Sequence, residues 1–323
     1  MENRTFDVTA LGELLIDFTE NGVSGQGNPL LEANPGGAPC NVLAMLQRLG
    51  RKTAFIGKVG KDMFGAQLRE AVASAGIDLR NLVEDEEVHT TLAFVHTKED
   101  GDRDFSFYRN PGADMMLRKE EIQDELIQNS RIFHFGTLSS THDGVRESTR
   151  HALRVAKEAG CMVSFDPNLR PPLWKSLDDA KAEIEYGLDQ ADILKISDNE
   201  VEFLFGTTDY DAGARMLIEK YQIPLICITL GKEGSRAYYK GLRVDAPGFI
   251  QKNTIETTGA GDTFCGCMLN SVLEYGLDNL TEEKLKELLL FANAAASVIT
   301  TRKGALRVMP TREEIDACRN GNQ

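Results

Sequence analysis

Short apolar runs alternate with segments of helical periodicity along the whole chain. The runs that indicate buried strands are Phe6–Leu11, Thr53–Val59, Arg131–Phe135, Met162–Phe165, Ile193–Ile196 and Leu225–Leu230. Apolar residues at helical spacing predict helices over Ala38–Leu49, Gly65–Ala75, Gly144–Glu158, Leu177–Leu188, Asp211–Tyr221, Thr263–Tyr275 and Glu282–Thr300. This alternation is typical of a mostly parallel sheet with helices on both faces. No repeat or linker interrupts it, so residues 1–323 are predicted to form a single domain.

Two segments depart from this rhythm and predict antiparallel strands, at about residues 14–33 and 90–110. The second pair is expected to turn at Lys98–Gly101, and Phe105 to Tyr108 alternate between apolar and polar as a one-sided strand does. A small separate sheet built from these pieces would need a substrate or a partner subunit to cover its apolar face. The alternative is an extension of the edge of the main sheet.

The charge balance excludes several classes of partner. The 323 residues carry a formal net charge of −14, which argues against binding to nucleic acid or to an anionic membrane. The N-terminus lacks the apolar run of a signal peptide, and no apolar run is long enough to cross a bilayer. The six cysteines are scattered, which favours reduced thiols in the cytoplasm, and the five histidines show no metal-binding spacing.

The strongest candidate for chemistry is the stretch Glu-Thr-Thr-Gly-Ala-Gly-Asp, residues 256–262. It follows residues 244–255, which are predicted to form short strands, and it precedes the helix expected from Thr263. Gly259 and Gly261 remove side chains, so a ligand can approach the backbone, and the first amides of a helix suit a phosphate. Asp262 is interpreted as a base for an attacking hydroxyl. The alternative is an ordinary acid in a first helical turn.

A second candidate region surrounds the start of the first helix. Gly36 and Gly37 permit a close ligand approach, and Asn41 offers a donor and an acceptor to a hydroxyl-rich ligand. Asp17, at the end of an apolar stretch, is a candidate acceptor for two sugar hydroxyls. A glycine-rich loop with a solvated Asn and a surface Asp is the alternative.

Further polar residues follow the predicted core strands. The carboxyl ends of parallel strands are where open α/β sheets bind ligands. Candidates there for phosphate, metal-bound water or nucleotide are Asn168, Arg170, Glu200, Thr229 and Gly231. Asn293 interrupts the apolar face of the last long helix, where a flat base would lie among small neighbours. The alternative for Arg170 is a solvated surface charge, and the alternative for Glu200 is an ordinary acid in the first turn of a helix. The alternative for Asn293 is an Asn whose hydrogen bonds are satisfied within the core.

Together these motifs resemble the ribokinase-like (PfkB) carbohydrate kinases, whose signature reads Asp-Thr-Thr-Gly-Ala-Gly-Asp. Within that family the chain is most similar to fructokinases. The likeness covers nearly the whole chain and is carried by Gly-Gly-Ala-Pro-Cys-Asn (36–41), Phe-Ile-Gly-Lys-Val-Gly (55–60), Arg-Asn-Pro-Gly-Ala-Asp (109–114), Phe-Asp-Pro-Asn-Leu-Arg (165–170), Lys-Ile-Ser-Asp (195–198) and Thr-Thr-Arg-Lys-Gly-Ala (300–305). It implies a ribokinase-like three-layer α/β/α fold with a β lid, and transfer of the γ-phosphoryl group of ATP, with Mg²⁺, to a sugar.

The resemblance also implies roles for individual residues. It makes Asp262 the catalytic base, Gly259, Ala260 and Gly261 the anion hole, and Arg170 a neighbour of the transferred phosphate or the substrate. The implied sugar contacts are Asp17, Gly36, Gly37, Asn41, Phe107 and Arg109. The implied nucleotide contacts are Asn168, Ser197, Thr229, Gly231, Gly234 and Asn293, with Glu200 acting on Mg²⁺ through water. Ser197 stands where many members have Asn.

One departure from the family signature is Glu256, which replaces an Asp that helps many members to bind a monovalent cation; K⁺ dependence therefore stays open. The leading hypothesis is a fructokinase that yields fructose 6-phosphate, possessing a homodimer interface on the lid. A 2-keto-3-deoxygluconate kinase is the nearest alternative, since Arg109 and Arg170 would serve a carboxylate. An inactive sugar-binding regulatory protein is the alternative of another class. A nicotinamide dehydrogenase is disfavoured because no Gly-x-Gly-x-x-Gly follows the first strand.

Overall fold

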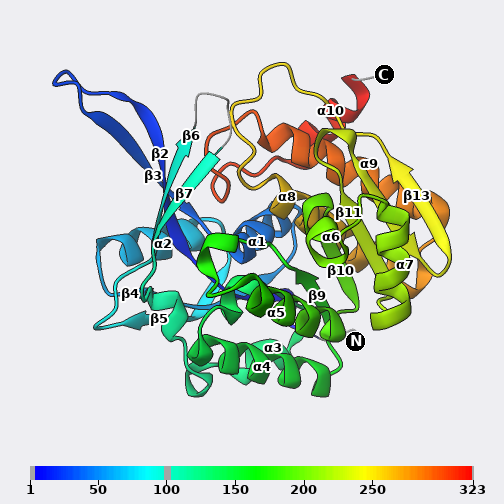
Figure 1. Cartoon of the computed structure of the whole chain (residues 1–323), viewed down its shortest axis with the longest axis horizontal. Helices are drawn as coiled ribbons and strands as arrows, with labels where there is room; N and C mark the ends of the chain where they lie inside the picture. Colours follow the sequence, from blue (N-terminus) through cyan, green and yellow to red (C-terminus); the bar gives the residue numbers. More distant parts are fainter. Residues whose placement is uncertain (1–3, 98–102, 322–323) are drawn as a thin grey trace.

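The computed structural model describes residues 4–97 and 103–321, and the main element in these ranges is a nine-stranded sheet. Figure 1 shows this sheet running through the body of the molecule. Its strands, in spatial order, are β13 (Leu242–Ala246), β12 (Ser235–Tyr239), β11 (Leu225–Thr229), β10 (Ile193–Ser197), β9 (Met162–Asp166), β8 (Ser130–Gly136), β1 (Phe6–Leu11), β4 (Thr53–Gly60) and β5 (Asp78–Asp85). The strands from β11 to β5 are parallel, and β12 and β13 add an antiparallel edge. The mostly parallel sheet is confirmed.

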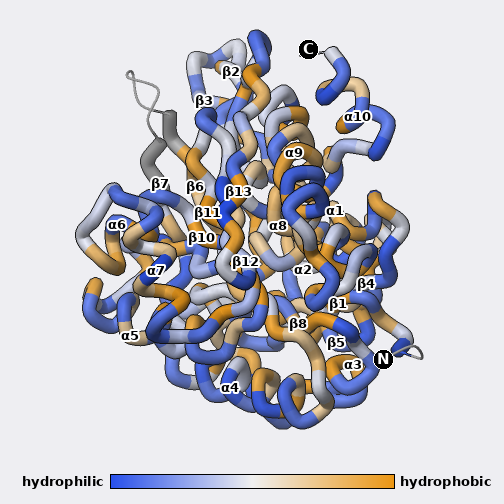
Figure 2. The backbone as a smooth tube through the Cα atoms, turned by 90° about the vertical axis from the view of Figure 1, so that its right-hand side faces the viewer, coloured by the Kyte–Doolittle hydropathy of each residue, from blue (hydrophilic) through white to orange (hydrophobic). Residues whose placement is uncertain are grey.

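Helices cover both faces of the sheet, which gives the predicted three layers. One face packs against α1 (Ala38–Arg48), α2 (Met63–Ser74), α8 (Ala260–Tyr275), α9 (Glu282–Ile299) and α10 (Arg312–Gly321). The other packs against α3 (Asp124–Gln128), α4 (Asp143–Glu158), α5 (Leu177–Gln190), α6 (Asp198–Phe205) and α7 (Tyr210–Tyr221). Figure 2 shows hydrophobic positions along the strands in the middle of the molecule and hydrophilic positions on the outer turns of helices such as α4.

A separate four-stranded sheet forms the predicted lid. Its order is β3 (Pro29–Gly36), β2 (Leu15–Val23), β6 (Leu92–Thr97) and β7 (Arg103–Tyr108). The pairs β2–β3 and β6–β7 are antiparallel as expected, and β2 joins β6 in parallel. The alternative prediction, that these strands extend the edge of the main sheet, is therefore wrong. The β2–β3 hairpin projects from the body in Figure 1. The expected turn at Lys98–Gly101 lies outside the described residues.

Two differences from the sequence prediction bear on the candidate site. Helix α8 begins at Ala260, three residues before the expected start, because Gly259 adopts φ 75° and lets the chain turn directly into the helix. Asp262 therefore lies inside the first turn. The strands predicted over residues 244–255 are also partly wrong, because β13 ends at Ala246 and an irregular segment follows it.

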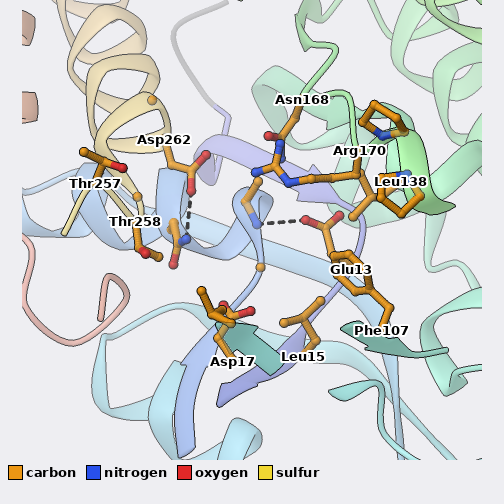
Figure 3. Close-up of a pocket in the computed structure, with 18 of the residues that line it drawn as sticks. Glu13, Leu15, Asp17, Phe107, Leu138, Asn168, Arg170, Thr257, Thr258 and Asp262 are labelled. Atoms are coloured by element: carbon orange, nitrogen blue, oxygen red, sulfur yellow. Dashed lines mark hydrogen bonds between the residues drawn. The ribbon is translucent and has the colours of Figure 1, made fainter. Parts of the chain in front are cut away.

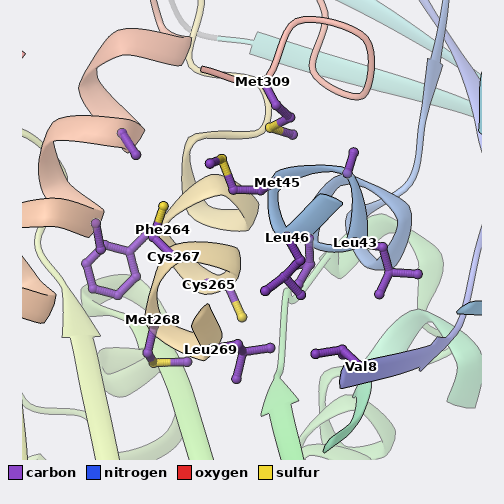
Figure 4. Close-up of a cluster of buried hydrophobic side chains, with 14 of the residues drawn as sticks. Val8, Leu43, Met45, Leu46, Phe264, Cys265, Cys267, Met268, Leu269 and Met309 are labelled. Atoms are coloured by element: carbon purple, nitrogen blue, oxygen red, sulfur yellow. The ribbon is translucent and has the colours of Figure 1, made fainter. Parts of the chain in front are cut away.

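The helix that carries Asp262 is anchored in the core. Figure 4 shows α8 side chains such as Cys265 and Leu269 interleaved with Leu43 and Leu46 of α1, above Val8 of β1. All five of these side chains are buried. Burial of a leucine-sized side chain stabilises a fold by about 1.5–3 kcal/mol, so the two helices have fixed positions relative to the sheet. Among the described residues, no helix is both long and apolar enough to cross a membrane.

Candidate active site

The start of α8 presents free backbone donors. Within its first turn, Ala260 N donates to Thr257 O at 3.2 Å and Thr263 N donates to Gly259 O at 2.8 Å. Among the described residues, the amides of Gly261 and Asp262 have no backbone acceptor. Unpaired amides at a helix N-terminus carry partial positive charge and bind anions.

The two glycines of this turn leave little room for a side chain. Gly259 is left-handed, and a β-carbon there would lie 2.5 Å from the Ala305 β-carbon. A β-carbon at Gly261 would lie 3.2 Å from Lys195 Nζ. Any larger residue would move either the loop at Ala305 or the ammonium group away from the helix end.

Asp262 is held by Asn41 across the interface between α8 and α1. Asn41 Nδ2 donates to Asp262 Oδ2 at 2.8 Å, a bond drawn as a dashed line in Figure 3. Burial raises the pKa of Asp262, while the Asn41 hydrogen bond and the charges of Lys195 and Arg170 lower it. The other amide atom, Asn41 Oδ1, is buried and has no partner among the described residues. An orphaned acceptor of this kind suits a ligand hydroxyl.

These groups line one cleft of about 520 Å³, between the lid and the carboxyl ends of the main strands. A volume of this size accommodates a small organic ligand. The lining residues are Glu13, Leu15, Asp17, Gly37, Ala38, Asn41, Val95, Phe107, Leu138, Asn168, Arg170, Pro171, Pro172, Lys195, Thr257, Thr258, Gly259, Gly261 and Asp262. The structure thus brings together most of the predicted sugar and anion-hole residues.

Asp17 enters the cleft from β2 of the lid. Its side chain fits because residue 36 is glycine: a β-carbon there would lie 2.5 Å from Asp17 Oδ2. The pKa of Asp17 is raised to about 7, chiefly by burial; the charge of Arg170 opposes this shift, and the charges of Asp262 and Glu256 add to it. A hydroxyl-rich ligand would supply the hydrogen bonds that this carboxylate needs.

Arg170 and Asn168 reach the cleft from the segment after β9. Asn168 is left-handed at φ 45°, and its amide donates to Asp166 Oδ1 at 3.1 Å. Arg170 donates to Leu169 O at 3.2 Å and has no carboxylate partner among the described residues. Figure 3 shows both side chains facing Asp262. The Arg170 guanidinium is therefore available to a phosphate or another anionic group.

Arg109 is placed differently from the sequence expectation. Its guanidinium donates to Asp114 Oδ2 at 2.6 and 2.8 Å, to Thr141 Oγ1 at 2.7 Å and to Leu138 O at 2.9 Å. The Arg109 and Asp114 side chains are only 2% exposed. Arg109 does not line the cleft, and its fixed partners occupy the donors that were expected to face a substrate.

Of the predicted nucleotide residues, Asn168 lines the cleft, whereas Ser197, Thr229, Gly231, Gly234 and Asn293 lie outside it. Asn293 is buried and donates to Ala246 O and Pro247 O at 3.2 and 3.0 Å, while its Oδ1 accepts from Ser235 Oγ at 2.9 Å. These bonds satisfy the Asn293 amide within the protein. Thr229 ends β11, and Gly231 and Gly234 form the next turn with φ 54° and 108°.

Ser197 and Glu200 cap α6. Glu200 Oε2 accepts from the amide and the hydroxyl of Ser197, each at 2.8 Å, and Glu200 Oε1 accepts from Leu169 N at 2.8 Å. Within the described ranges no group of three or more His, Cys, Asp or Glu side chains could hold a metal ion. A divalent ion would have to find most of its ligands in phosphate oxygens and water.

Glu256 reaches a second loop. Its Oε1 accepts from Gly304 N at 2.7 Å, and the amides of Ile255 and Glu256 donate to Thr300 O at 2.8 and 3.2 Å. The segment before α8 and the segment after α9 are thereby joined through the chain's own carboxylate.

Ala260, the middle residue of the predicted anion hole, is the first residue of α8.

Two charged lining residues escaped the sequence analysis. Glu13 follows β1 and is only 4% exposed; its Oε1 accepts from Ala38 N at 2.8 Å, and burial raises its pKa to about 7. Lys195 lies inside the apolar strand β10 and forms an ion pair with Asp166 Oδ2 at 3.0 Å. The signal in both cases is a charged residue within a run that should be buried.

Comparison with known proteins identifies this arrangement. Residues 5–312 match the pfkB family carbohydrate kinase. The chain belongs to this family. It is 42% identical to "Probable fructokinase-2" of Arabidopsis thaliana over 307 residues, which are 94% of this chain and 93% of that protein.

Solved structures of PfkB kinases share the fold. The crystal structure of fructokinase with bound ATP from Xylella fastidiosa aligns with a TM-score of 0.88 and 31% identity, covering 98% of each chain. A double-mutant fructokinase from Vibrio cholerae O395, with fructose, ADP and potassium ion bound, aligns with a TM-score of 0.87 and 30% identity, covering 98% of this chain and 99% of that one. The ribokinase-like fold with a β lid is confirmed.

Proposed function

We propose that this protein is an ATP-dependent fructokinase that converts D-fructose to fructose 6-phosphate. One observation carries the proposal: the unpaired amides of Gly261 and Asp262 open onto the same cleft as the carboxylate that Asn41 holds. Donors for a phosphoryl group and a base for a hydroxyl stand side by side, which is what phosphoryl transfer requires.

In this proposal Asp262 accepts the proton of the sugar's 6-hydroxyl. The turn Gly259–Gly261, with Ala260 between the glycines, presents the unpaired amides of Gly261 and Asp262, and these stabilise charge on the phosphoryl group. Asp17 and the orphaned Asn41 Oδ1 bind other hydroxyls, while Gly36 and Gly37 keep the backbone close to the sugar. Phe107 covers the sugar from the lid.

Arg170 provides a positive charge near the phosphoryl group. The nucleotide is assigned to the side of Asn168, Ser197, Thr229, Gly231, Gly234 and Asn293; because the Asn293 amide is internally bonded, its part there is to shape the surface against the base. Mg²⁺ would neutralise phosphate charge when bound with ATP, and we assign to Glu200 the orientation of its water.

The cleft favours a neutral sugar over 2-keto-3-deoxygluconate. Of the two arginines that would suit a substrate carboxylate, Arg109 is already paired with Asp114. Glu13, Asp17 and Asp262 place three carboxyl groups around the lining, against the guanidinium of Arg170 and the ammonium of Lys195, which is already paired with Asp166. A substrate carboxylate would meet repulsion that uncharged hydroxyls do not.

The proposed kinase unit is the whole chain, residues 1–323, with lid strands from residues 14–33 and 90–110. The lid exposes large apolar side chains, Val23 at 68% and Tyr108 at 68% among them, and we assign to it the interface of a homodimer. All six cysteines are free thiols, which favours a cytoplasmic location. Light scattering tests the dimer, which should separate when Val23 is replaced by Glu.

The deciding experiment is a kinase assay across fructose, ribose, 2-keto-3-deoxygluconate and adenosine, following ADP release. Fructose should give the highest kcat/KM. Asp262→Asn should lower kcat by roughly 10²–10⁴, the usual worth of a positioned acid–base group, while still binding fructose. Fructose binding by the wild type without ADP release would favour a regulatory protein, and a preference for 2-keto-3-deoxygluconate would favour that kinase.

A further inference from the structure

Lys195 is a buried cation in the middle of the main sheet. It lies on β10 between β9 and β11, it is 6% exposed, and the adjacent strand residues Leu194 and Ile196 are fully buried. An ammonium group in such surroundings is costly unless it is paired. Apolar residues fill neighbouring positions, so packing alone gives no reason for a charge here.

The pairing of Lys195 is incomplete. Its Nζ lies 3.0 Å from Asp166 Oδ2 and 3.2 Å from Asp166 Oδ1, on the neighbouring strand β9. Asp166 is the sole acceptor that the described part of the chain offers to this group. An ammonium has three N–H donors, so donor capacity remains on the side of Lys195 that lines the cleft.

The free side of Lys195 adjoins the anion hole. Its Nζ lies 3.2 Å from the point that a β-carbon on Gly261 would occupy. The unpaired amides belong to Gly261 and Asp262, which line the same cleft as Lys195. An anion held by these amides would therefore contact the ammonium group as well.

We propose that Lys195 is a catalytic residue that binds the transferring phosphoryl group together with the amides at the start of α8, and that Asp166 positions it. This inference rests on the proposed function. In the step, the bond from the terminal phosphorus to the bridging oxygen of ATP breaks and leaves its electron pair on ADP. A bond from that phosphorus to the sugar oxygen forms, and the hydroxyl proton passes to Asp262. Lys195 stabilises the charge on the non-bridging phosphoryl oxygens.

Asp166 keeps Lys195 protonated and fixes the position of its ammonium group. Burial lowers the pKa of Lys195, but the charges of Asp166 and Glu200 outweigh it and raise the pKa overall. Strands β9 and β10 are paired in register through Phe165 and Leu194, which places Asp166 beside Lys195. The ammonium is thus fixed before substrate binds and needs no reorganisation during transfer.

The test compares Lys195→Met with Lys58→Met in the full chain. Lys58 is a matched control, because it is also buried on an inner strand, β4, and ion-paired, to Asp85 at 3.0 Å and Glu121 at 2.9 Å, but it does not line the cleft. Lys195→Met should lower kcat by roughly 10²–10³, as loss of one oxyanion donor does, with the KM for fructose nearly unchanged. Lys58→Met should lower the thermal midpoint and leave kcat unchanged.

A second readout separates a catalytic from a structural role. With fructose present, the wild type should bind ADP with aluminium fluoride, a mimic of the transferring phosphoryl group, more tightly than ADP alone. Lys195→Met should bind ADP normally and lose that gain, and Asp166→Asn should lose part of it. If Lys195→Met does not fold, Lys195→Gln replaces it in both measurements.

The outcomes are distinguishable. A wild type without fructose-dependent ADP release overturns the proposed function. A wild type that is active, beside a Lys195 variant that folds and retains both kcat and the aluminium fluoride gain, overturns the role of Lys195 alone. Equal losses in Lys195→Met and Lys58→Met would also overturn it, because they would reflect the loss of any buried ion pair.

Discussion

Asn41 and Asp262 are 221 residues apart in the chain, yet Asn41 Nδ2 donates to Asp262 Oδ2 at 2.8 Å. Asn41 lies in the first turn of α1 and Asp262 in the first turn of α8, and the two helices pack together beside the sheet. One amide therefore contacts the base through Nδ2 and leaves Oδ1 for a ligand. In the proposed function, this one side chain would contact both the base and the substrate.

Asn41→Ala should shift the acidic limb of the kcat–pH profile to higher pH. The Asn41 hydrogen bond lowers the pKa of Asp262 against the effect of burial, so its removal raises that pKa. The base works only when deprotonated, and a hydrogen bond to a charged group is worth about 1.5–3 kcal/mol, which corresponds to a shift of roughly 1–2 pH units. Steady-state rates between pH 5 and 9 test this.

Gln47→Ala is the control for that measurement. Gln47 lies on the same helix but bonds Thr53 Oγ1 and Gly76 O, away from the base. It should leave the limb in place. An Asn41→Ala profile that superimposes on the wild type would mean that another group governs the limb.

Gly36→Ala should weaken fructose binding without unfolding the protein. The new β-carbon would lie 2.5 Å from Asp17 Oδ2, so the carboxylate must move from its position in the cleft. Loss of hydrogen bonds to a charged group of about 1.5–3 kcal/mol predicts a roughly ten- to hundredfold higher KM for fructose. Gly25→Ala, in the same hairpin with nothing within 4 Å of its β-carbon, should be neutral. Equal KM values for the two variants would exclude Asp17 as a sugar ligand.

The fold was predictable where burial leaves a strong pattern. Central strands such as β1 and β11 are mostly apolar and buried, and they were identified with nearly correct ends. The edge strand β5 was missed because most of its residues are partly exposed and polar, so its sequence does not look like a strand. Helix α8 was found, but its start depended on the left-handed Gly259, which periodicity does not reveal.

The candidate site was predictable where a motif is local in sequence. The Gly-Ala-Gly-Asp turn contains its own donors and its own acid. Lys195 depends on strand register, which brings Asp166 of β9 beside it, and a single sequence does not specify that register. Arg109 is the opposite case. Its motif is easy to recognise in the sequence, but in the folded protein its guanidinium is paired with Asp114 and does not line the cleft.

Glu13→Gln should make the unfolding free energy less dependent on pH. Burial raises the pKa of Glu13 to about 7, whereas an unfolded glutamate titrates near pH 4.3. Between these values the folded state binds the extra proton, so the Glu13 contribution makes the wild type less stable as pH rises through this window. Glutamine still accepts from Ala38 N and does not titrate.

Urea unfolding of the ligand-free protein at pH 5 and pH 8 measures this effect. The unfolding free energy of Glu13→Gln minus that of the wild type should be larger at pH 8 than at pH 5. The increase should be roughly 2–3 kcal/mol, as an upper estimate. Glu158→Gln, on an exposed position of α4, gives the baseline. If the two variants have the same pH dependence, the carboxyl of Glu13 is not isolated from water as the structure indicates.

Activity should depend little on K⁺, because Glu256 already joins the two loops beside the anion hole. Its Oε1 accepts from Gly304 N at 2.7 Å, and the next residue, Ala305, packs against Gly259. Glu256→Asp shortens the side chain by one methylene, so the contact with Gly304 should be lost and a cation should become useful. We therefore expect similar kcat in K⁺ and in tetramethylammonium for the wild type, and a higher kcat in K⁺ for Glu256→Asp. Glu256→Ala removes the carboxylate and should lose activity in both salts. Activation of the wild type by K⁺ of about tenfold or more, equivalent to 1.4 kcal/mol of barrier, would show that the glutamate binds a cation instead of replacing it.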